Sequence, residues 1–320
     1  PKPSGKGFPG AYSSPTIVRV GTTYHAYFAK QSFGGKHYNV PHAKFDDAGN
    51  FTVVGEALPK LGAGADDTDP YEVWAPAVAQ IDATHWMLYY AATVSGTVSK
   101  KCIWRAHASD PDGPFVDDYA GPLVCSDASQ WSIDPYVVKD DAGTWQLSAR
   151  IDQPGGINTI QNRPLGPQGE SFAAGSDWTE LTHNAPTSWE QPVLENAAVV
   201  QLTPPSGPAH WFVFYSGGAW DKNTYAVGYA DCGTSLTGGA CVKKTPTGPW
   251  MASDKATDVW GPGTPTFYTN ASGATLMSVQ AWQYSGGKSN AMNNGQIMRT
   301  YTLTIDNAYV PTATLVRVDL

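Results

Sequence analysis

The sequence has little charge, no long apolar run and no concentration of basic residues. Only 15% of its 320 residues are charged, and 28 Asp and Glu against 20 Lys and Arg give a formal net charge of −8. Without a basic stripe, nucleic acid and acidic membranes are poor partners. No apolar run reaches the roughly eighteen residues of a membrane-spanning helix. The seven histidines show no metal-binding spacing. His25 and His37 are therefore interpreted as strand residues, and no metal site is expected.

Cysteine is also scarce, but its four positions are informative. Cys102 and Cys125 flank one hairpin region, and Cys232 and Cys241 bracket a Gly-rich turn. An even count at short spacing is compatible with two disulfides, each closing a small loop. The alternative is four reduced thiols in a cytosolic protein. We favour the disulfides and therefore expect a secreted protein.

Aromatic residues, glycine and proline are abundant, and they follow a repeat. Five times, a small or polar residue, usually followed by proline, precedes an apolar run, a turn and an aromatic-rich strand. The matching positions are Pro15, Pro76, Pro135, Ala197 and Pro265, in steps of 61, 59, 62 and 68 residues. A long repeat of strand-rich units is typical of an architecture that closes on itself. We predict an all-β, five-bladed β-propeller that fills residues 1–320 as one domain, with more polar outer hairpins.

The head of each repeat should form the innermost strand of its blade, so five side chains converge at one mouth of the central channel. They stand at or near Ser14, Trp74, Asp134, Glu195 and Thr264. Two carboxylates then face a pocket walled by some of the 12 Trp and 16 Tyr residues. Aromatic faces beside carboxylates suit sugar rings. Glycoside hydrolysis needs one carboxylic acid and one carboxylate, and crowding like charges raises the pKa of one of them.

Four segments, in order and at matching spacing, resemble glycoside hydrolase family 43 between about Ser14 and Arg299. They are Trp74-Ala75-Pro76, Ile133-Asp134-Pro135 with the following 139–145 segment, Leu194-Glu195-Asn196-Ala197 and Gly261-Pro262-Gly263. The resemblance implies an inverting five-bladed propeller that cuts arabinofuranosyl or xylosyl linkages of plant cell walls.

The same resemblance assigns roles to individual residues. Glu195 would be the general acid, and Asp134 would be the auxiliary carboxylate that tunes the acid and holds the sugar. Trp74 would shape the pocket, and Arg299 would match an arginine that reaches the substrate. Independently of the resemblance, a pocket closed by loops such as residues 33–35 and Trp220 would favour removal of terminal sugars, whereas an open groove would favour endo-cleavage.

The sequence departs from the family pattern at the general base. The family begins its first blade with Asp-Pro, whose Asp activates water, but Ser14 stands here. A serine hydroxyl cannot take that proton unaided. Three readings remain open: a base relocated to Asp66, Asp67, Asp69 or Glu72, a non-hydrolytic glycan binder, or an engineered or misaligned site. Without the family resemblance, the acidic cluster is interpreted as an ordinary solvated loop.

A second departure concerns the axis of the propeller. Thr264 follows Gly-Pro-Gly where the family often has a histidine that helps to hold an axial ion or water. This weakens the case for an axial calcium ion, and no cofactor is expected to be required.

The combined hypothesis is a secreted, monomeric, exo-acting α-L-arabinofuranosidase for a neutral plant-type oligo- or polysaccharide. Glu195 and Asp134 would be its catalytic residues, with Asp69 or Glu72 as the base. One alternative is a lectin-like pseudo-enzyme that kept the sugar pocket. Another is a retaining propeller hydrolase acting on fructans or galactosides, which would need a carboxylate nucleophile at Ser14.

Overall fold

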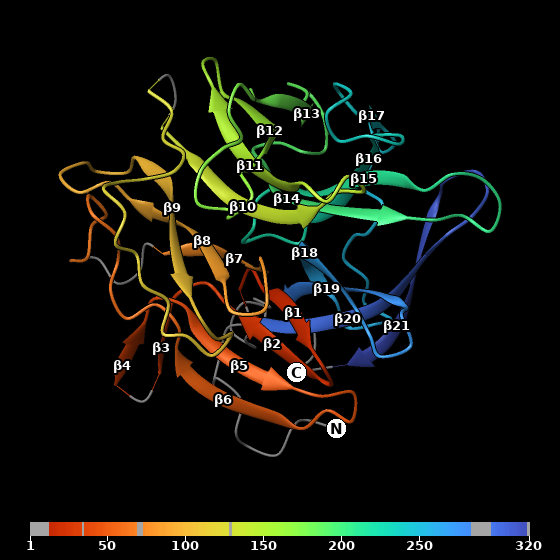
Figure 1. The fold of residues 1–320 in the computed structure, drawn as a ribbon. Helices are drawn as coiled ribbons and strands as arrows, with labels where there is room; N and C mark the ends of the chain where they lie inside the picture. The colour runs from red at the N-terminus through yellow and green to blue at the C-terminus, as the bar shows by residue number, and fades with distance from the viewer. Residues whose placement is uncertain (1–12, 34, 69–72, 128–129, 283–295, 319–320) are drawn as a thin grey trace.

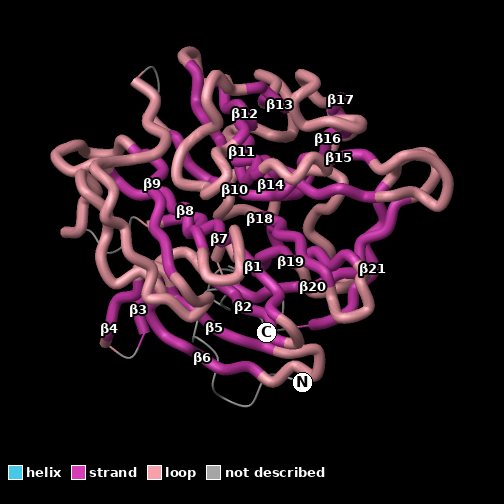
Figure 2. The backbone as a smooth tube through the Cα atoms, viewed as in Figure 1, coloured by secondary structure: helices cyan, strands magenta, loops and turns pink. Residues whose placement is uncertain are grey.

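The chain folds into five antiparallel sheets arranged around a common centre (Figure 1). The structure is a computed structural model that describes residues 13–33, 35–68, 73–127, 130–282 and 296–318. In these residues the secondary structure is strands and loops without a helix (Figure 2). No helix in the described part is long and apolar enough to cross a membrane.

Each sheet corresponds to one sequence repeat, which confirms the five-bladed β-propeller. Blade 1 contains β1 (Thr16–Val20), β2 (Thr23–Tyr27), β5 (Pro41–Phe45) and β6 (Phe51–Glu56). Blade 2 contains β7 (Trp74–Gln80), β8 (Trp86–Thr93) and β9 (Lys101–Ala108), and blade 3 contains β10 (Ser132–Lys139), β11 (Trp145–Gln153), β12 (Ile157–Pro164) and β13 (Thr179–His183). Blade 4 contains β14 (Leu194–Leu202), β15 (His210–Gly217), β16 (Ala226–Asp231) and β17 (Val242–Lys243). Blade 5 contains β18 (Trp260–Thr269), β19 (Thr275–Trp282), β20 (Gln296–Ile305) and β21 (Pro311–Val318), and a separate hairpin pairs β3 (Gln31–Phe33) with β4 (Lys36–Tyr38).

The innermost strands close a ring. Strand β1 contacts β7, β7 contacts β10, β10 contacts β14, β14 contacts β18, and β18 returns to β1. Radial repetition of this kind leaves only short, protected sheet edges. It also brings the heads of the five repeats together around the axis.

The backbone repeats one unusual conformation at the start of every blade. Five residues at matching positions have positive φ angles: Ser14 (45°), Ala75 (44°), Asp134 (54°), Asn196 (64°) and Thr264 (47°). Left-handed backbone is costly for residues other than glycine, and it concentrates at functional sites. Register shifts interrupt the pairing of β7, β10, β14 and β18 at the same places. Each blade therefore turns sharply where it meets the axis.

This alignment corrects one detail of the expected convergence. Ser14, Asp134 and Thr264 occupy the left-handed position itself, whereas Trp74 and Glu195 stand one residue earlier. Successive side chains in a strand point to opposite sides. The side chains of these two groups of residues therefore point in different directions from the start of their blades. Blades 1, 3 and 4 each contribute two successive residues to the mouth of the channel, whereas blade 2 contributes Trp74 and blade 5 contributes Thr264.

The outer halves of the blades are less polar than predicted. Third strands β9 and β16 are largely buried rather than alternating. Neighbouring loops cover them: Val116 and Val124 bridge to β9, and Met251 bridges to Val227 on β16. Blade 2 has three named strands among the described residues, with the Val116 bridge in the place of an outer strand.

Both expected disulfides are present. Cys102 is bonded to Cys125 across 23 residues, and Cys232 to Cys241 across nine. The first lies in the hydrophobic cluster of blades 1 and 2, and the second packs against that of blades 3 and 4. The cysteines are therefore oxidised within their own repeats, as the sequence spacing indicated.

Candidate active site

A cavity of about 480 Å³ opens at the mouth of the channel. Its walls include residues that are far apart in the sequence and that come from the blade starts and the loops above them. The lining residues are Ser13, Ser14, Ala29, Lys30, Trp74, Trp131, Ile133, Asp134, Val193, Glu195, Asn196, Trp220, Tyr225, Thr264, Gln280 and Gln296. Six residues predicted from the sequence therefore meet in one cavity: Ser14, Trp74, Asp134, Glu195, Thr264 and Trp220.

Asp134 is the more buried of the two cavity carboxylates. It is 7% exposed, and its Oδ2 accepts a hydrogen bond of 3.0 Å from the backbone N–H of Asn196 on the next blade. Burial, followed by the nearby negative charge of Glu195, raises the pKa of Asp134 to about 7. Arg150 opposes this shift. A proton on Asp134 is therefore the favoured state of the pair below neutral pH.

Glu195 is held by two donors from other strands. Arg150 Nη1 donates to its Oε2 at 3.0 Å, and the Tyr225 hydroxyl donates to its Oε1 at 2.7 Å. The same hydroxyl accepts a hydrogen bond of 2.8 Å from Asn196 Nδ2. These contacts fix the orientation of the Glu195 carboxylate at the cavity wall.

Arg150 is the centre of the polar network, and the sequence reasoning missed it. Its Nε and Nη2 bond the two carboxylate oxygens of Asp152 at 2.7 and 2.9 Å. Asp152 Oδ1 also accepts from Asn158 Nδ2 at 2.9 Å. Asn158 Oδ1 in turn accepts from the backbone N–H of Leu194, which precedes Glu195. These hydrogen bonds therefore fix the orientation of the Arg150 guanidinium group before any ligand binds.

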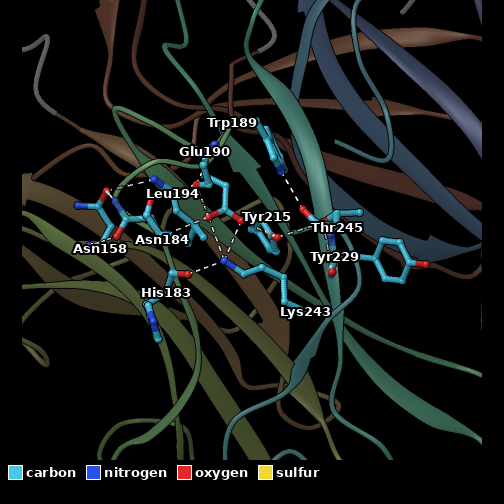
Figure 3. Close-up of polar contacts among 12 residues, drawn as sticks. Asn158, His183, Asn184, Trp189, Glu190, Leu194, Tyr215, Tyr229, Lys243 and Thr245 are labelled. Atoms are coloured by element: carbon cyan, nitrogen blue, oxygen red, sulfur yellow. Dashed lines mark hydrogen bonds and ion pairs between the residues drawn. The ribbon is translucent and has the colours of Figure 1, made fainter. Parts of the chain in front are cut away.

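A second buried network holds the loop that leads to Glu195 (Figure 3). Glu190 is 0% exposed, and Lys243 Nζ lies 2.8 Å from its Oε1. The hydroxyl of Tyr215 donates to the same carboxylate at 2.9 Å, and Lys243 also bonds the carbonyl of His183 at 2.6 Å. This ion pair fastens residues 183–190 against blade 4 and so fixes the approach to β14.

Aromatic residues and cations form one wall of the cavity. The rings of Trp74 and Trp131 meet edge to face, with centroids 5.8 Å apart. Lys101 lies 3.9 Å from the Trp74 ring centre, and Arg150 lies 5.1 Å from that of Trp131. Trp220 differs from these because it is 52% exposed, at the outer rim. The wall offers rigid faces for a sugar ring, and Trp220 offers a second surface.

Ser14 occupies the position that the resemblance gives to the general base. Its backbone N–H donates to Gln280 Oε1 at 2.8 Å, and Ser13 Oγ donates to Gln296 Oε1 at 2.7 Å. Among the described residues that line the cavity, the carboxylates are Asp134 and Glu195. A carboxylate base at this position is therefore missing from the described part of the wall.

The acidic loop before Trp74 is described only in part. Asp66 accepts hydrogen bonds from the backbone N–H and the hydroxyl of Thr68, as in an ordinary solvated turn, and Asp67 is exposed. Neither lines the cavity. Asp69 and Glu72 lie outside the described residues. Their assignment as the relocated base stays a prediction.

Arg299 lies on β20, the third strand of blade 5, rather than on its last strand. It is 1% exposed, and its Nη2 lies 3.5 Å from the carbonyl oxygen of Asp258. It is not among the described residues that line the cavity. The guanidinium that reaches the cavity carboxylates is that of Arg150.

The donor set at the propeller axis is poor for calcium. A second, narrow cavity of about 30 Å³ is lined by the left-handed residues and the prolines that follow them. Asp134 is the one carboxylate of this lining among the described residues. Thr264 Oγ1 is a buried oxygen without a hydrogen-bond partner there. Calcium takes six to eight oxygens with several carboxylates, so these residues do not fit it. That catalysis needs no cofactor stays a prediction.

Comparisons with known proteins agree with this arrangement. The profile of "Glycosyl hydrolases family 43" matches residues 8–301. No curated protein sequence matches the chain. Among solved structures, an endo-1,4-β-xylanase from Bacteroides thetaiotaomicron is similar at 22% identity and a TM-score of 0.73, with 97% of this chain and 95% of that one covered.

Two further solved structures share the fold. An α-L-arabinanase from Cellvibrio cellulosa has 17% identity and a TM-score of 0.70, with 95% of both chains covered. An α-L-arabinofuranosidase from Lactobacillus brevis has 16% identity and a TM-score of 0.68, with 94% of this chain and 93% of that one covered.

Proposed function

The chain belongs to glycosyl hydrolases family 43, and from this premise we propose that it removes arabinofuranosyl or related pentosyl residues from plant cell-wall polysaccharide. The observation that carries the proposal is the buried carboxylate pair, Asp134 and Glu195, in an aromatic-walled cavity of about 480 Å³. Structural relatives named as xylanase, arabinanase and arabinofuranosidase support a pentose-containing substrate.

Glu195 is proposed as the general acid that protonates the leaving oxygen. One proton shared by Asp134 and Glu195 would reside on the more buried Asp134 in the free protein, because its pKa is the raised one. The proposed role requires this proton on Glu195 when the sugar is bound, with Asp134 as the neighbouring anion.

The aromatic wall suits the removal of terminal sugars. Trp74 and Trp131 would stack on the ring that undergoes hydrolysis, and Trp220 at the rim would contact the next unit. Two disulfides are compatible with secretion, so we place the substrate outside the cell. We also expect the protein to act as a monomer.

A second candidate function rests on Ser14. If neither Asp69 nor Glu72 reaches the attacking water, the cavity would bind terminal pentoses without cleaving them. In this second candidate function, the cavity makes the same contacts with the sugar as in the first, and only the general base is missing.

One experiment separates the two candidates. The chain and its Glu195→Gln variant are incubated with arabinan, arabinoxylan and aryl pentofuranosides, and product stereochemistry is followed by NMR. Hydrolysis with inversion, reduced about 10²–10⁴-fold in the variant, supports the enzyme. Saturable binding of the same sugars without products supports the binder. Full activity of the variant would refute Glu195 as the acid.

A further inference from the structure

A cluster of metal-binding side chains lies away from the cavity, at the contact between blades 1 and 2. It consists of His25 on β2, His42 on β5 and Asp112 in the turn after β9. One potential ligand atom of each lies within 4.8 Å of the other two. His25 is 4% exposed and His42 is 0% exposed, whereas the Asp112 side chain is 38% exposed.

Strand register explains why the two histidines meet. His25 is paired with Lys44, and Tyr27 with His42, in the antiparallel β2–β5 ladder. Residues opposite each other in such a ladder, and residues two apart along a strand, share one face of the sheet. All four side chains therefore stand on the same face of blade 1. The turn that carries Asp112 packs onto this face.

Two distances within the cluster match those of ligands around a small cation, and the third pair of ligand atoms lies within 4.8 Å. His25 Nδ1 lies 3.1 Å from His42 Nε2 and 3.4 Å from Asp112 Oδ1. Tetrahedral ligands at the usual zinc bond lengths are about 3.3–3.4 Å apart, by simple geometry from bonds of about 2.0–2.1 Å. A cation could thus be accommodated with small movements of the rings.

Surrounding residues hold the three ligands in place. The Tyr27 ring stacks on His42 with centroids 4.5 Å apart and planes inclined by 9°, and the Tyr27 hydroxyl donates to the carbonyl of Pro111. Lys44 pairs with Asp112 Oδ2. The opposite oxygen, Asp112 Oδ1, is buried and has no hydrogen-bond partner among the described residues. In metal sites, a carboxylate that binds the metal is typically also held by a hydrogen bond from a neighbouring residue.

We propose that His25, His42 and Asp112 form a zinc-type metal site that links blade 1 to the turn of blade 2. Two imidazoles and one carboxylate suit a late first-row divalent ion, whereas calcium and magnesium prefer oxygen ligands alone. The sequence shows no metal-binding motif because the ligands lie on two strands and a turn, at spacings of 17 and 70 residues.

Zinc titration of the full chain tests the site. The chain, without a histidine tag and treated with chelator, is titrated with ZnCl₂ by calorimetry, and cobalt absorption reports the coordination geometry. We expect one ion per chain, a tetrahedral cobalt spectrum and a melting temperature that rises until one equivalent is bound. No saturable binding at micromolar concentrations would overturn the proposal.

Variants assign the ligands. Asp112→Asn and His25→Gln should each weaken zinc binding at least tenfold. Asp112 is half exposed, so its variant tests the site even if a change at the buried histidine prevents folding. His107→Gln is the matched control, because His107 Nε2 lies 3.3 Å from Asp118 in an exposed pair outside the cluster. Unchanged binding in Asp112→Asn, or an equal loss in His107→Gln, would refute the assignment.

Discussion

Arg150 and Glu195 face each other across the junction of blades 3 and 4, with Nη1 3.0 Å from Oε2. The arginine side chain is 2% exposed and that of Glu195 is 16% exposed. The guanidinium also bonds Asp152 through two nitrogens and reduces the raised pKa of Asp134. One guanidinium therefore interacts with three carboxyl groups, those of Glu195, Asp152 and Asp134.

Replacement of Arg150 should lower the stability of the fold and change the protonation behaviour of the site. Arg150→Gln leaves buried carboxylates without a partner, and loss of one member of a buried pair costs about 3–5 kcal/mol. We expect a lower melting temperature and a change in the pH dependence of ligand binding or turnover. Arg105→Gln is the matched control, since Arg105 bonds the Gly121 carbonyl and covers the Tyr119 ring in blade 2. Equal changes of the pH dependence in both variants would contradict a specific role for Arg150.

Removal of the Tyr225 hydroxyl tests how Glu195 is oriented. Tyr225→Phe loses the bond to Glu195 Oε1 and the one from Asn196 Nδ2. A neutral hydrogen bond contributes about 1 kcal/mol to stability, so the variant should fold. We expect kcat to fall about tenfold with little change in KM, because general acid catalysis depends on geometry. Tyr229→Phe, in the same blade outside the cavity lining, should retain the parent kinetics. A Tyr225→Phe variant with parent kcat would show that this contact is structural only.

The repeat and the family motifs predicted the blades, and they placed Asp134, Glu195 and Trp74 in one cavity. They did not predict Arg150, because its position depends on the β10–β11 register, which sets it opposite Ile133. A shift by one residue would turn its side chain to the other face. The strand Trp145–Gln153 alternates apolar and polar residues, and Arg150 stands on the polar side with Gln146, Ser148 and Asp152. Such a pattern is typical of a solvated face, so the sequence did not single Arg150 out.

The polarity of the outer strands was predicted incorrectly for a related reason. A propeller blade is covered by loops from its own repeat, such as the segment around Val124 over β9. Alternation in the sequence does not show where such loops lie. For the same reason, the sequence does not show that His25 and His42 lie next to Asp112, because this contact depends on packing between two blades.

Protonation of Asp134 predicts how stability varies with pH. Its pKa is raised in the folded protein from an ordinary value near 3.8 to about 7. Between these values the folded state binds more protons than the unfolded state, so this group stabilises the fold at low pH. That contribution decreases as pH rises through about 7. Asp134→Asn keeps a neutral side chain at every pH. We expect its free energy of unfolding to fall less between pH 4 and pH 8 than that of the parent chain, as measured by urea denaturation. Parallel pH curves would contradict a buried neutral Asp134.

The buried pair of Glu190 and Lys243 predicts a stability effect separate from the sugar site (Figure 3). Glu190→Gln leaves the Lys243 ammonium, whose side chain is 20% exposed, without its carboxylate. Because loss of one member of a buried pair costs about 3–5 kcal/mol, we expect a markedly lower melting temperature. Glu180→Gln is the matched control: Glu180 pairs with His183, but their side chains are 43% and 57% exposed. Such a surface pair contributes at most about 1 kcal/mol. Calorimetric melting of both variants checks the difference. An equal, small effect would mean that water screens Lys243 and that the 183–190 loop is held by its other contacts.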